Sequence, residues 1–198
     1  MGEASSNEGA HVTTLRRLGP AGAEIPAIED EDRVFDLRPL TDDIDGAFLA
    51  DGGIERAREA VQERYLPTLD GAHDLRVGAP IARPTAIICI GQNYAAHAAE
   101  SGNPPPEMPI VFFKHPSSMV GPNDPIALPR RSSKVDWEVE LGIVIGSRST
   151  YLESDEAAMA AIAGYVTSHD VSERDWQINH SSGQWALGKS APTFAPVG

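Results

Sequence analysis

Two glutamates, Glu138 and Glu140, stand two positions apart within the otherwise apolar stretch 137–145. In a β-strand, successive side chains point to opposite faces, so both carboxylates would share one face, about 6.5–7 Å apart. Carboxylates this close repel each other, and a hard cation such as Mg²⁺ or Mn²⁺, which prefers oxygen ligands, would relieve the repulsion. The spacing therefore indicates a candidate metal site. One alternative is a half-exposed strand whose outward positions happen to be acidic. Another is the acid pair of a glycosidase, but an aromatic content of 6% leaves few side chains on which a sugar could stack.

A second candidate pair is His97 and Glu100, which lie three residues apart in a short predicted helix over residues 94–100. Residues three apart on a helix share a face, and a histidine oriented by a carboxylate is a competent general base near neutral pH. The alternative is a surface histidine with a salt-bridge neighbour. Polar residues are also dense over 168–177, after an apolar strand, where either binding residues or turn and capping residues are expected.

Hydrophobic periodicity predicts the elements that would position these residues. We predict strands over residues 86–90, 111–113, 136–145 and 165–170. A helix of about ten residues is expected to begin after Ser154, as N-cap, and to end at Gly164. In the strand that carries the two glutamates, the residues of the other face form an apolar row that we expect to face the core: Trp137, Val139, Leu141, Ile143 and Ile145.

The first part of the chain has a different pattern. Short strands broken by turn residues are expected over 12–40, with the acidic run 29–32 at a hairpin tip, where its like charges stay in water. Apolar residues at helical spacing predict a helix over about 54–64. We place a domain boundary near residue 82. The predicted organisation is a disordered tail (1–10), a small β-rich domain (11–82) and a second domain (83–198).

The composition narrows the class of protein. The 198-residue chain has a formal net charge of −13, which argues against a nucleic-acid or anionic-membrane partner, because such partners need a basic face. An anionic substrate would therefore need a local positive centre. The single cysteine, Cys89, lies in an apolar run and is predicted to be a core residue. The chain shows no signal peptide and no run that could span a bilayer, and its lone cysteine suits a reducing compartment, so a cytoplasmic location is expected.

Several motifs, taken in their order along the chain, resemble the fumarylacetoacetate hydrolase superfamily, and in particular its acylpyruvase-like branch, which acts on 2-oxo acids. The resemblance covers about residues 83–198. The motifs are Ile90-Gly91-Gln92-Asn93-Tyr94-Ala95-Ala96-His97, Pro109-Ile110-Val111-Phe112-Phe113-Lys114, Asp136-Trp137-Glu138-Val139-Glu140-Leu141, Gly164-Tyr165, Asp170-Val171-Ser172-Glu173-Arg174-Asp175-Trp176-Gln177 and Gly188-Lys189-Ser190.

The resemblance implies a role for each matching position. Glu138, Glu140 and Asp170 match the three metal-binding carboxylates of the family, whose ion is usually Mg²⁺ or Mn²⁺. His97 and Glu100 match a catalytic His/Glu pair on a mobile lid helix of the acylpyruvase-like members. Lys189, Arg174 and Gln177 match positions that contact the substrate or polarise its oxygens. We expect Lys189 to act in catalysis, and Arg174 and Gln177 to bind the substrate.

The resemblance also implies an α+β, mainly β fold, namely a mixed β-sandwich roll preceded by a small β-rich N-terminal domain, in a homodimer. The family's catalytic domain normally continues beyond the position of Gly198 and includes a Gly/Thr/Pro-rich substrate loop, so we expect the chain to be truncated at its C-terminus. A substrate-contacting tyrosine of the fumarylacetoacetate-cleaving members falls near Ser181, which favours the broader 2-oxo acid branch.

The reaction that the resemblance implies is hydrolysis of a C–C bond in acylpyruvate-type 2,4-dioxo acids. His97 would activate a water, the enolate of pyruvate would leave stabilised by the metal, and Lys189 would help to neutralise its charge. The His97/Glu100 pair favours hydrolysis, since that step needs an activated water. Three other reactions can use the same enolate and stay open as alternatives: decarboxylation of oxaloacetate, isomerisation of a hydroxymuconate-type diacid and hydration of a 2-oxo-4-enoate. A non-catalytic scaffold also stays open.

Overall fold

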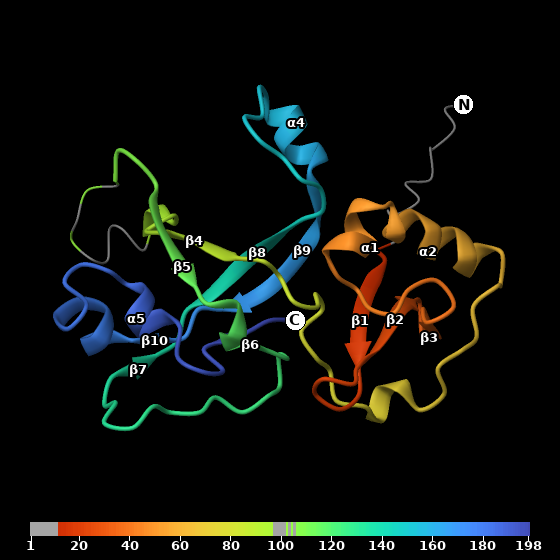
Figure 1. The fold of residues 1–198 in the computed structure, drawn as a ribbon, viewed down its shortest axis with the longest axis horizontal. Helices are drawn as coiled ribbons and strands as arrows, with labels where there is room; N and C mark the ends of the chain where they lie inside the picture. Colours follow the sequence, from red (N-terminus) through yellow and green to blue (C-terminus); the bar gives the residue numbers. More distant parts are fainter. Residues whose placement is uncertain (1–11, 97–101, 103, 105) are drawn as a thin grey trace, which may run out of the picture.

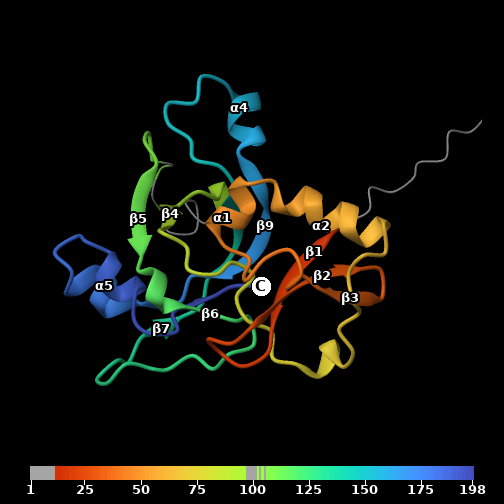
Figure 2. The same cartoon turned by 45° about the vertical axis from the view of Figure 1, so that its right-hand side comes forward.

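The computed structural model describes residues 12–96, 102, 104 and 106–198. The predicted tail over residues 1–10 lies outside the described residues. The described chain forms an N-terminal part with a small sheet and two α-helices, followed by a second part made mainly of short strands (Figure 1). The two parts lie side by side, and Gly198 lies between them (Figures 1 and 2). The fold is therefore of the mainly β, α+β class that the sequence predicts.

The N-terminal part is built on an antiparallel sheet in the order β1-β2-β3. Its elements are β1 (Thr14–Leu18), β2 (Ile25–Asp30), β3 (Arg33–Asp36), α1 (Gly46–Ala50), α2 (Gly53–Gln62) and η1 (Ala72–Asp74). The β2–β3 hairpin turns at Glu31 and Asp32, which are exposed, so the prediction of an acidic hairpin tip is confirmed. The predicted helix over 54–64 corresponds to α2.

Two hydrophobic clusters lie within the N-terminal part. The larger one packs the sheet against the two helices, because α2 places Ala57 and Ala60 on one face one turn apart. Its buried members are Ile28, Phe35, Leu37, Ile44, Phe48, Ala57, Ala60 and Leu66. A smaller cluster contains Leu18, Ala27, Val34 and Ala72. This part of the chain thus has a core of its own. The boundary near residue 82 and the division into domains stay predictions.

The second part contains two longer antiparallel hairpins, β4–β5 and β8–β9, and two short strand pairs, β7–β10 and β6–β11. The strands are β4 (Ile87–Gly91), β5 (Ile110–Lys114), β6 (Met119–Val120), β7 (Val135–Asp136), β8 (Val139–Ile145), β9 (Ile162–His169), β10 (Ser172–Glu173) and β11 (Ala195–Pro196). The helical segments are η2 (Pro116–Ser118), α4 (Asp155–Ala160), the π-helical η3 (Asp175–Asn179) and α5 (Ala186–Lys189). Because the described strands form separate small sheets, the sandwich roll stays a prediction.

The predicted single strand over residues 136–145 is wrong in one respect, because the structure divides it into β7 and β8. The break falls at Trp137 and Glu138, where the chain leaves its pairing with β10 and begins its pairing with β9. At the start of the break, the side chain of Asp136 accepts a hydrogen bond from Trp137 N at 2.9 Å. Strand propensity cannot show such a change of partner, since it depends on segments distant in sequence.

The predicted ten-residue helix is also too long. Ser154 is its N-cap, as predicted, and its hydroxyl accepts a hydrogen bond from Ala157 N. The helix α4 ends at Ala160, however, because β9 begins at Ile162 and pairs at once with Ile145 of β8. Strand pairing thus overrides the helix-favouring alanines that follow. Among the described residues, no helix combines the length and apolar character that crossing a bilayer requires.

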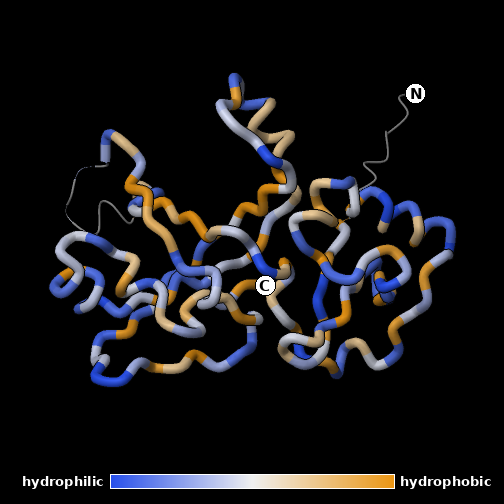
Figure 3. Tube along the Cα trace, viewed as in Figure 1, coloured by the Kyte–Doolittle hydropathy of each residue, from blue (hydrophilic) through white to orange (hydrophobic). Residues whose placement is uncertain are grey.

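The apolar row opposite the two glutamates does not face a core in the described chain. We name it the exposed strand face; its members Trp137, Val139, Leu141, Ile143 and Ile145 are 72%, 67%, 61%, 54% and 58% exposed. The prediction that they are buried is therefore wrong for this structure, although their alternation with Glu138 and Glu140 is as predicted. Hydrophobic residues lie along both hairpins of the second part (Figure 3). The buried cluster of the second part lies elsewhere, around Val171, Ala191 and Phe194.

Candidate metal centre

Three carboxylates meet at one end of the β8–β9 hairpin. Glu138 immediately precedes β8, Glu140 is its second residue, and Asp170 immediately follows β9. The hairpin register pairs Val139 with His169, and Asp170 N donates to Glu138 O at 2.9 Å, so the two strand ends are held opposite each other. One oxygen from each carboxylate lies within 4.8 Å of the others. The structure thus brings together the three residues that the sequence nominates as metal ligands.

The donor set fits a hard divalent cation. All three ligands offer carboxylate oxygens, which Mg²⁺ and Mn²⁺ prefer. Asp170 is 1% exposed, and Glu138 and Glu140 are half-buried, so their mutual repulsion is weakly screened by water. The site therefore needs positive charge, from side chains, from an ion or from both.

Side-chain cations supply part of that charge. Lys189 Nζ lies 2.8 Å from Glu138 Oε2 and 2.6 Å from Asp170 Oδ2. Arg174 Nη1 lies 2.6 Å from Glu138 Oε1, and Lys114 Nζ lies 2.6 Å from Asp170 Oδ1. Glu140, in contrast, forms no ion pair with any residue that the structure describes.

Because only Glu138 has cationic partners among the described residues, the pKa values of Glu138 and Glu140 shift in opposite directions. Burial, together with the negative charges of Asp170 and Glu138, raises the pKa of Glu140 to about 7. Burial acts in the same direction on Glu138, but the bonds from Lys189 and Arg174 outweigh it and hold the pKa of Glu138 below its usual range. Glu140 is therefore the carboxylate that lacks a compensating charge.

The predicted substrate-contacting residues lie beside the carboxylates. Arg174 follows β10, and its guanidinium also donates to Asp136 Oδ2 and, at 3.1 Å, to Gln177 Oε1. Gln177 is 5% exposed and lies in η3. The structure therefore groups Arg174 and Gln177 with the acidic residues, as the resemblance implies.

Lys189 is positioned by an unusually close backbone contact. It follows Gly188 in α5, which contacts η3, β5 and β10. A Cβ atom at Gly188 would lie 2.5 Å from Gln177 N and 2.6 Å from Glu173 O, so only glycine allows this approach. The ammonium of Lys189 also lies 5.0 Å from the centre of the Phe112 ring. Lys189 is 1% exposed as a result.

Sequence reasoning assigned no role to Lys114, although it belongs to one of the quoted motifs. It is the last residue of β5, whose buried positions are Phe112 and Lys114. A lysine on the inward face of an otherwise apolar strand was the available signal, because lysine is rarely fully buried without a partner.

Cys89, on the neighbouring β4, is buried, and burial together with Asp170 and Glu140 raises the pKa of its thiol to about 12. This thiol therefore stays protonated, which fits the predicted core role.

The predicted His/Glu pair, His97 and Glu100, lies outside the described residues. Three residues before His97, the described Tyr94 accepts a hydrogen bond on its hydroxyl from Leu141 N at 3.4 Å. The chain thus passes beside β8, one residue from Glu140, shortly before it reaches His97.

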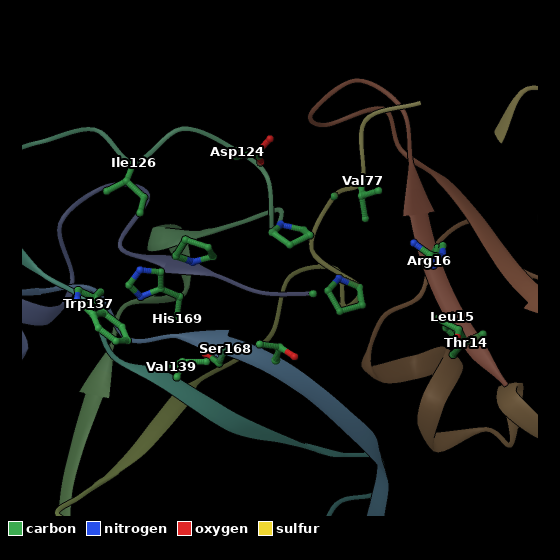
Figure 4. Close-up of a pocket in the computed structure, with 16 residues that line it drawn as sticks. Thr14, Leu15, Arg16, Val77, Asp124, Ile126, Trp137, Val139, Ser168 and His169 are labelled. Carbon is green, nitrogen blue, oxygen red and sulfur yellow. The ribbon is translucent and has the colours of Figure 1, made fainter. Parts of the chain in front are cut away.

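A separate cavity of about 520 Å³ lies between β1 and the β8–β9 hairpin (Figure 4). Its lining includes Arg16, Trp137 and His169, but none of the predicted site residues that the structure describes. Because His169 and Asp170 are consecutive along an extended chain, their side chains point to opposite sides. This cavity is therefore distinct from the carboxylate cluster.

Comparisons with known proteins agree with the motifs. The family model for the C-terminal domain of fumarylacetoacetate (FAA) hydrolase matches residues 86–198. A protein from Burkholderia lata, named as a hydrolase without a stated substrate, is 48% identical over 186 residues, which are 93% of this chain and 64% of that protein. The chain thus spans about 64% of the length of the curated relatives it matches.

Two solved structures are similar in fold as well as in sequence. Fumarylacetoacetate hydrolase from Exiguobacterium antarcticum matches with a TM-score of 0.72 and 30% identity, over 94% of this chain and 66% of that one. The 5-carboxymethyl-2-hydroxymuconate delta-isomerase from Mycobacterium smegmatis matches with a TM-score of 0.66 and 31% identity, over 93% and 63%. The similar proteins therefore include both a hydrolase and an isomerase.

Proposed function

Because this chain belongs to the fumarylacetoacetate hydrolase family, we propose that it provides the metal centre of a hydrolase that cleaves a C–C bond in acylpyruvate-type 2,4-dioxo acids. The single observation that carries the proposal is the meeting of Glu138, Glu140 and Asp170 within 4.8 Å. These residues would hold one Mg²⁺ or Mn²⁺ ion. When bound, the ion supplies a Lewis acid that polarises the substrate's 2-oxo group and favours an enolate leaving group.

The surrounding charges suit a small anionic substrate. Because Arg174 also pairs with Asp136, the three cations Lys114, Lys189 and Arg174 face four carboxylates, and the site keeps a formal charge of about −1 within a chain of net charge −13. A divalent ion would add the local positive centre that attracts a carboxylate. Electrostatics thus support a small anionic substrate.

The side chains have separate proposed tasks. Arg174 and Gln177 would bind the substrate carboxylate, because a guanidinium and an amide both offer N–H donors to its oxygens. Lys189 would stabilise negative charge as the C–C bond breaks. His97, oriented by Glu100, would take a proton from the attacking water.

An isomerase is the second candidate, and the similarity to the Mycobacterium smegmatis isomerase favours it. Isomerisation, decarboxylation of oxaloacetate and hydration of a 2-oxo-4-enoate could use the same carboxylate cluster. Only hydrolysis requires His97 to activate water for attack on a carbonyl. The two candidates therefore differ in their need for that residue.

The first experiment measures metal uptake by the purified chain. Isothermal titration calorimetry with Mn²⁺ should show one site, and Glu140→Gln, which removes one ligand, should weaken binding by at least about tenfold. Glu153→Gln, an exposed substitution outside the cluster, should bind as the wild type does. The absence of any Mn²⁺ binding to the wild type would contradict the proposed centre.

The second experiment measures turnover. The Mn²⁺-loaded chain is assayed against acetylpyruvate, oxaloacetate and a hydroxymuconate-type diacid, with His97→Ala in parallel. Hydrolysis of acetylpyruvate that His97→Ala abolishes supports the proposal. Activity on the diacid alone favours the isomerase, and Mn²⁺ binding without turnover of any of the three favours a metal-binding scaffold.

A further inference from the structure

Asp170 is held between two buried ammonium groups, one on each oxygen of its carboxylate. Lys114 Nζ donates to Oδ1 at 2.6 Å, and Lys189 Nζ donates to Oδ2 at 2.6 Å. Lys114 is 2% exposed, and Lys189 and Asp170 are each 1% exposed. Both pairs therefore lie in a medium where moving one partner leaves the other unsatisfied at considerable cost.

The two lysines differ in their other contacts. Lys114 donates also to Val171 O at 3.1 Å, so it ties the Asp170 side chain to the backbone that follows β9. Lys189 instead reaches Glu138 Oε2 at 2.8 Å, so its ammonium bridges two of the three carboxylates of the metal centre. A cation shared by these carboxylates would therefore compete with the ammonium of Lys189 for their negative charge. Lys114 has no ion pair with Glu138 or Glu140 among the described residues.

We propose that Lys114 is a positioning residue of the metal centre, which fixes the orientation of the Asp170 carboxylate by holding its Oδ1 atom. Lys189 is the internal cation whose bonds to Asp170 and Glu138 would loosen when a divalent ion binds. This loosening also frees its ammonium for the substrate. This inference rests on the proposed metal-dependent function and adds a division of tasks between the two lysines.

The two roles predict opposite effects on metal affinity. If both lysines acted only through their charge, removing either would reduce repulsion of the ion and tighten binding. A residue that orients a metal-ligating carboxylate behaves differently, because its loss commonly costs 10–100-fold in affinity. The sign of the change therefore separates a positioning lysine from a purely electrostatic one.

The experiment titrates the metal-free chain with Mn²⁺ by calorimetry. Lys114→Met should weaken binding by about 10–100-fold, whereas Lys189→Met should bind as tightly as the wild type or more tightly. Cys89→Ala is the matched control, since it creates a small packing defect on β4 beside β5 without a change in charge. It should lower the unfolding temperature and leave the Mn²⁺ affinity unchanged.

Each outcome decides the matter. Lys114→Met binding as tightly as the wild type, or Lys189→Met weakening binding as much as Lys114→Met does, would overturn the inference while leaving the metal centre intact. A wild-type chain that takes up no Mn²⁺ would instead overturn the proposed function. Should Lys114→Met not fold, Lys114→Gln takes its place, because its neutral amide is too short to hold Oδ1 in the same position. Weaker binding by this variant supports positioning, and unchanged or tighter binding refutes it.

Discussion

Each carboxylate of the cluster has its own surroundings. Glu138 forms ion pairs with Lys189 and Arg174, and Asp170 forms ion pairs with Lys189 and Lys114. Glu140 has no such partner among the described residues, and burial together with its two acidic neighbours raises its pKa to about 7. A metal ion would remove this difference by supplying the charge that Glu140 lacks. The properties of Glu140 therefore report most directly on whether the centre is loaded.

The raised pKa of Glu140 predicts how the stability of the metal-free protein depends on pH. The folded protein keeps this proton up to about pH 7, while the unfolded chain loses it near the ordinary value of 4.5. The stabilisation linked to this proton is therefore fully present below about pH 4.5 and is lost as the pH rises through 7. Glu140→Gln cannot ionise, so its unfolding temperature should match the wild type at pH 4.5 and exceed it at pH 8, by circular dichroism in EDTA.

The control is Glu153→Gln, which removes an exposed carboxylate outside the cluster and should follow the wild type at both pH values. If Glu140→Gln has no advantage at pH 8, the carboxylate is not destabilised by its surroundings. With saturating Mn²⁺, the advantage at pH 8 should reverse, because the variant has lost a ligand.

At the residue scale, the alternation of apolar and acidic positions was enough to nominate Glu138 and Glu140, because strand geometry alone places them on one face. Asp170 came from the family resemblance, since nothing local distinguishes it from a turn residue. Lys114 was missed because its role depends on contacts with Asp170 and Val171, more than fifty residues away. Pairing across such separations is not encoded in local periodicity.

At the element scale, the β8–β9 hairpin and α5 do most of the positioning. The hairpin register sets Glu138 against Asp170, and the close packing of α5 on η3 and β10 brings Lys189 between them. The sequence predicted these strands through their periodicity. It did not predict the break at Trp137 and Glu138 or the early end of α4, because both are consequences of which strand pairs with which.

The contact at Gly188 gives a prediction for α5. A methyl group there would lie 2.5 Å from Gln177 N and 2.6 Å from Glu173 O, both backbone atoms that cannot move independently. Gly188→Ala should therefore shift α5 and lower the free energy of unfolding by about 1–3 kcal/mol. Urea denaturation followed by tryptophan fluorescence measures this change.

The matched control for Gly188→Ala is Gly164→Ala in β9, where an added Cβ would meet nothing within 4 Å. That substitution should change the free energy of unfolding by less than about 0.5 kcal/mol. Equal stability of the two variants would show that α5 does not pack on η3 as closely as described.

At the scale of the whole molecule, burial is uneven. The N-terminal part encloses its hydrophobic clusters, whereas the second part leaves the exposed strand face in contact with water. Strand alternation predicted which residues share that face, but it could not predict whether anything in the described chain covers it. Exposed apolar surface of this extent promotes association in water, while the net charge of −13 opposes it.

The last prediction concerns the exposed strand face. The purified chain should bind the dye ANS and should associate with increasing concentration, because adjacent apolar side chains on β8 are more than half exposed. Leu141→Glu should reduce dye fluorescence and the weight-average mass in light scattering, yet leave the unfolding temperature nearly unchanged, since Leu141 is 61% exposed. Leu128→Glu alters a side chain that is 70% exposed outside this face, so it should change neither signal. A large loss of stability in Leu141→Glu would contradict the prediction, because it would mean that the chain buries this face itself.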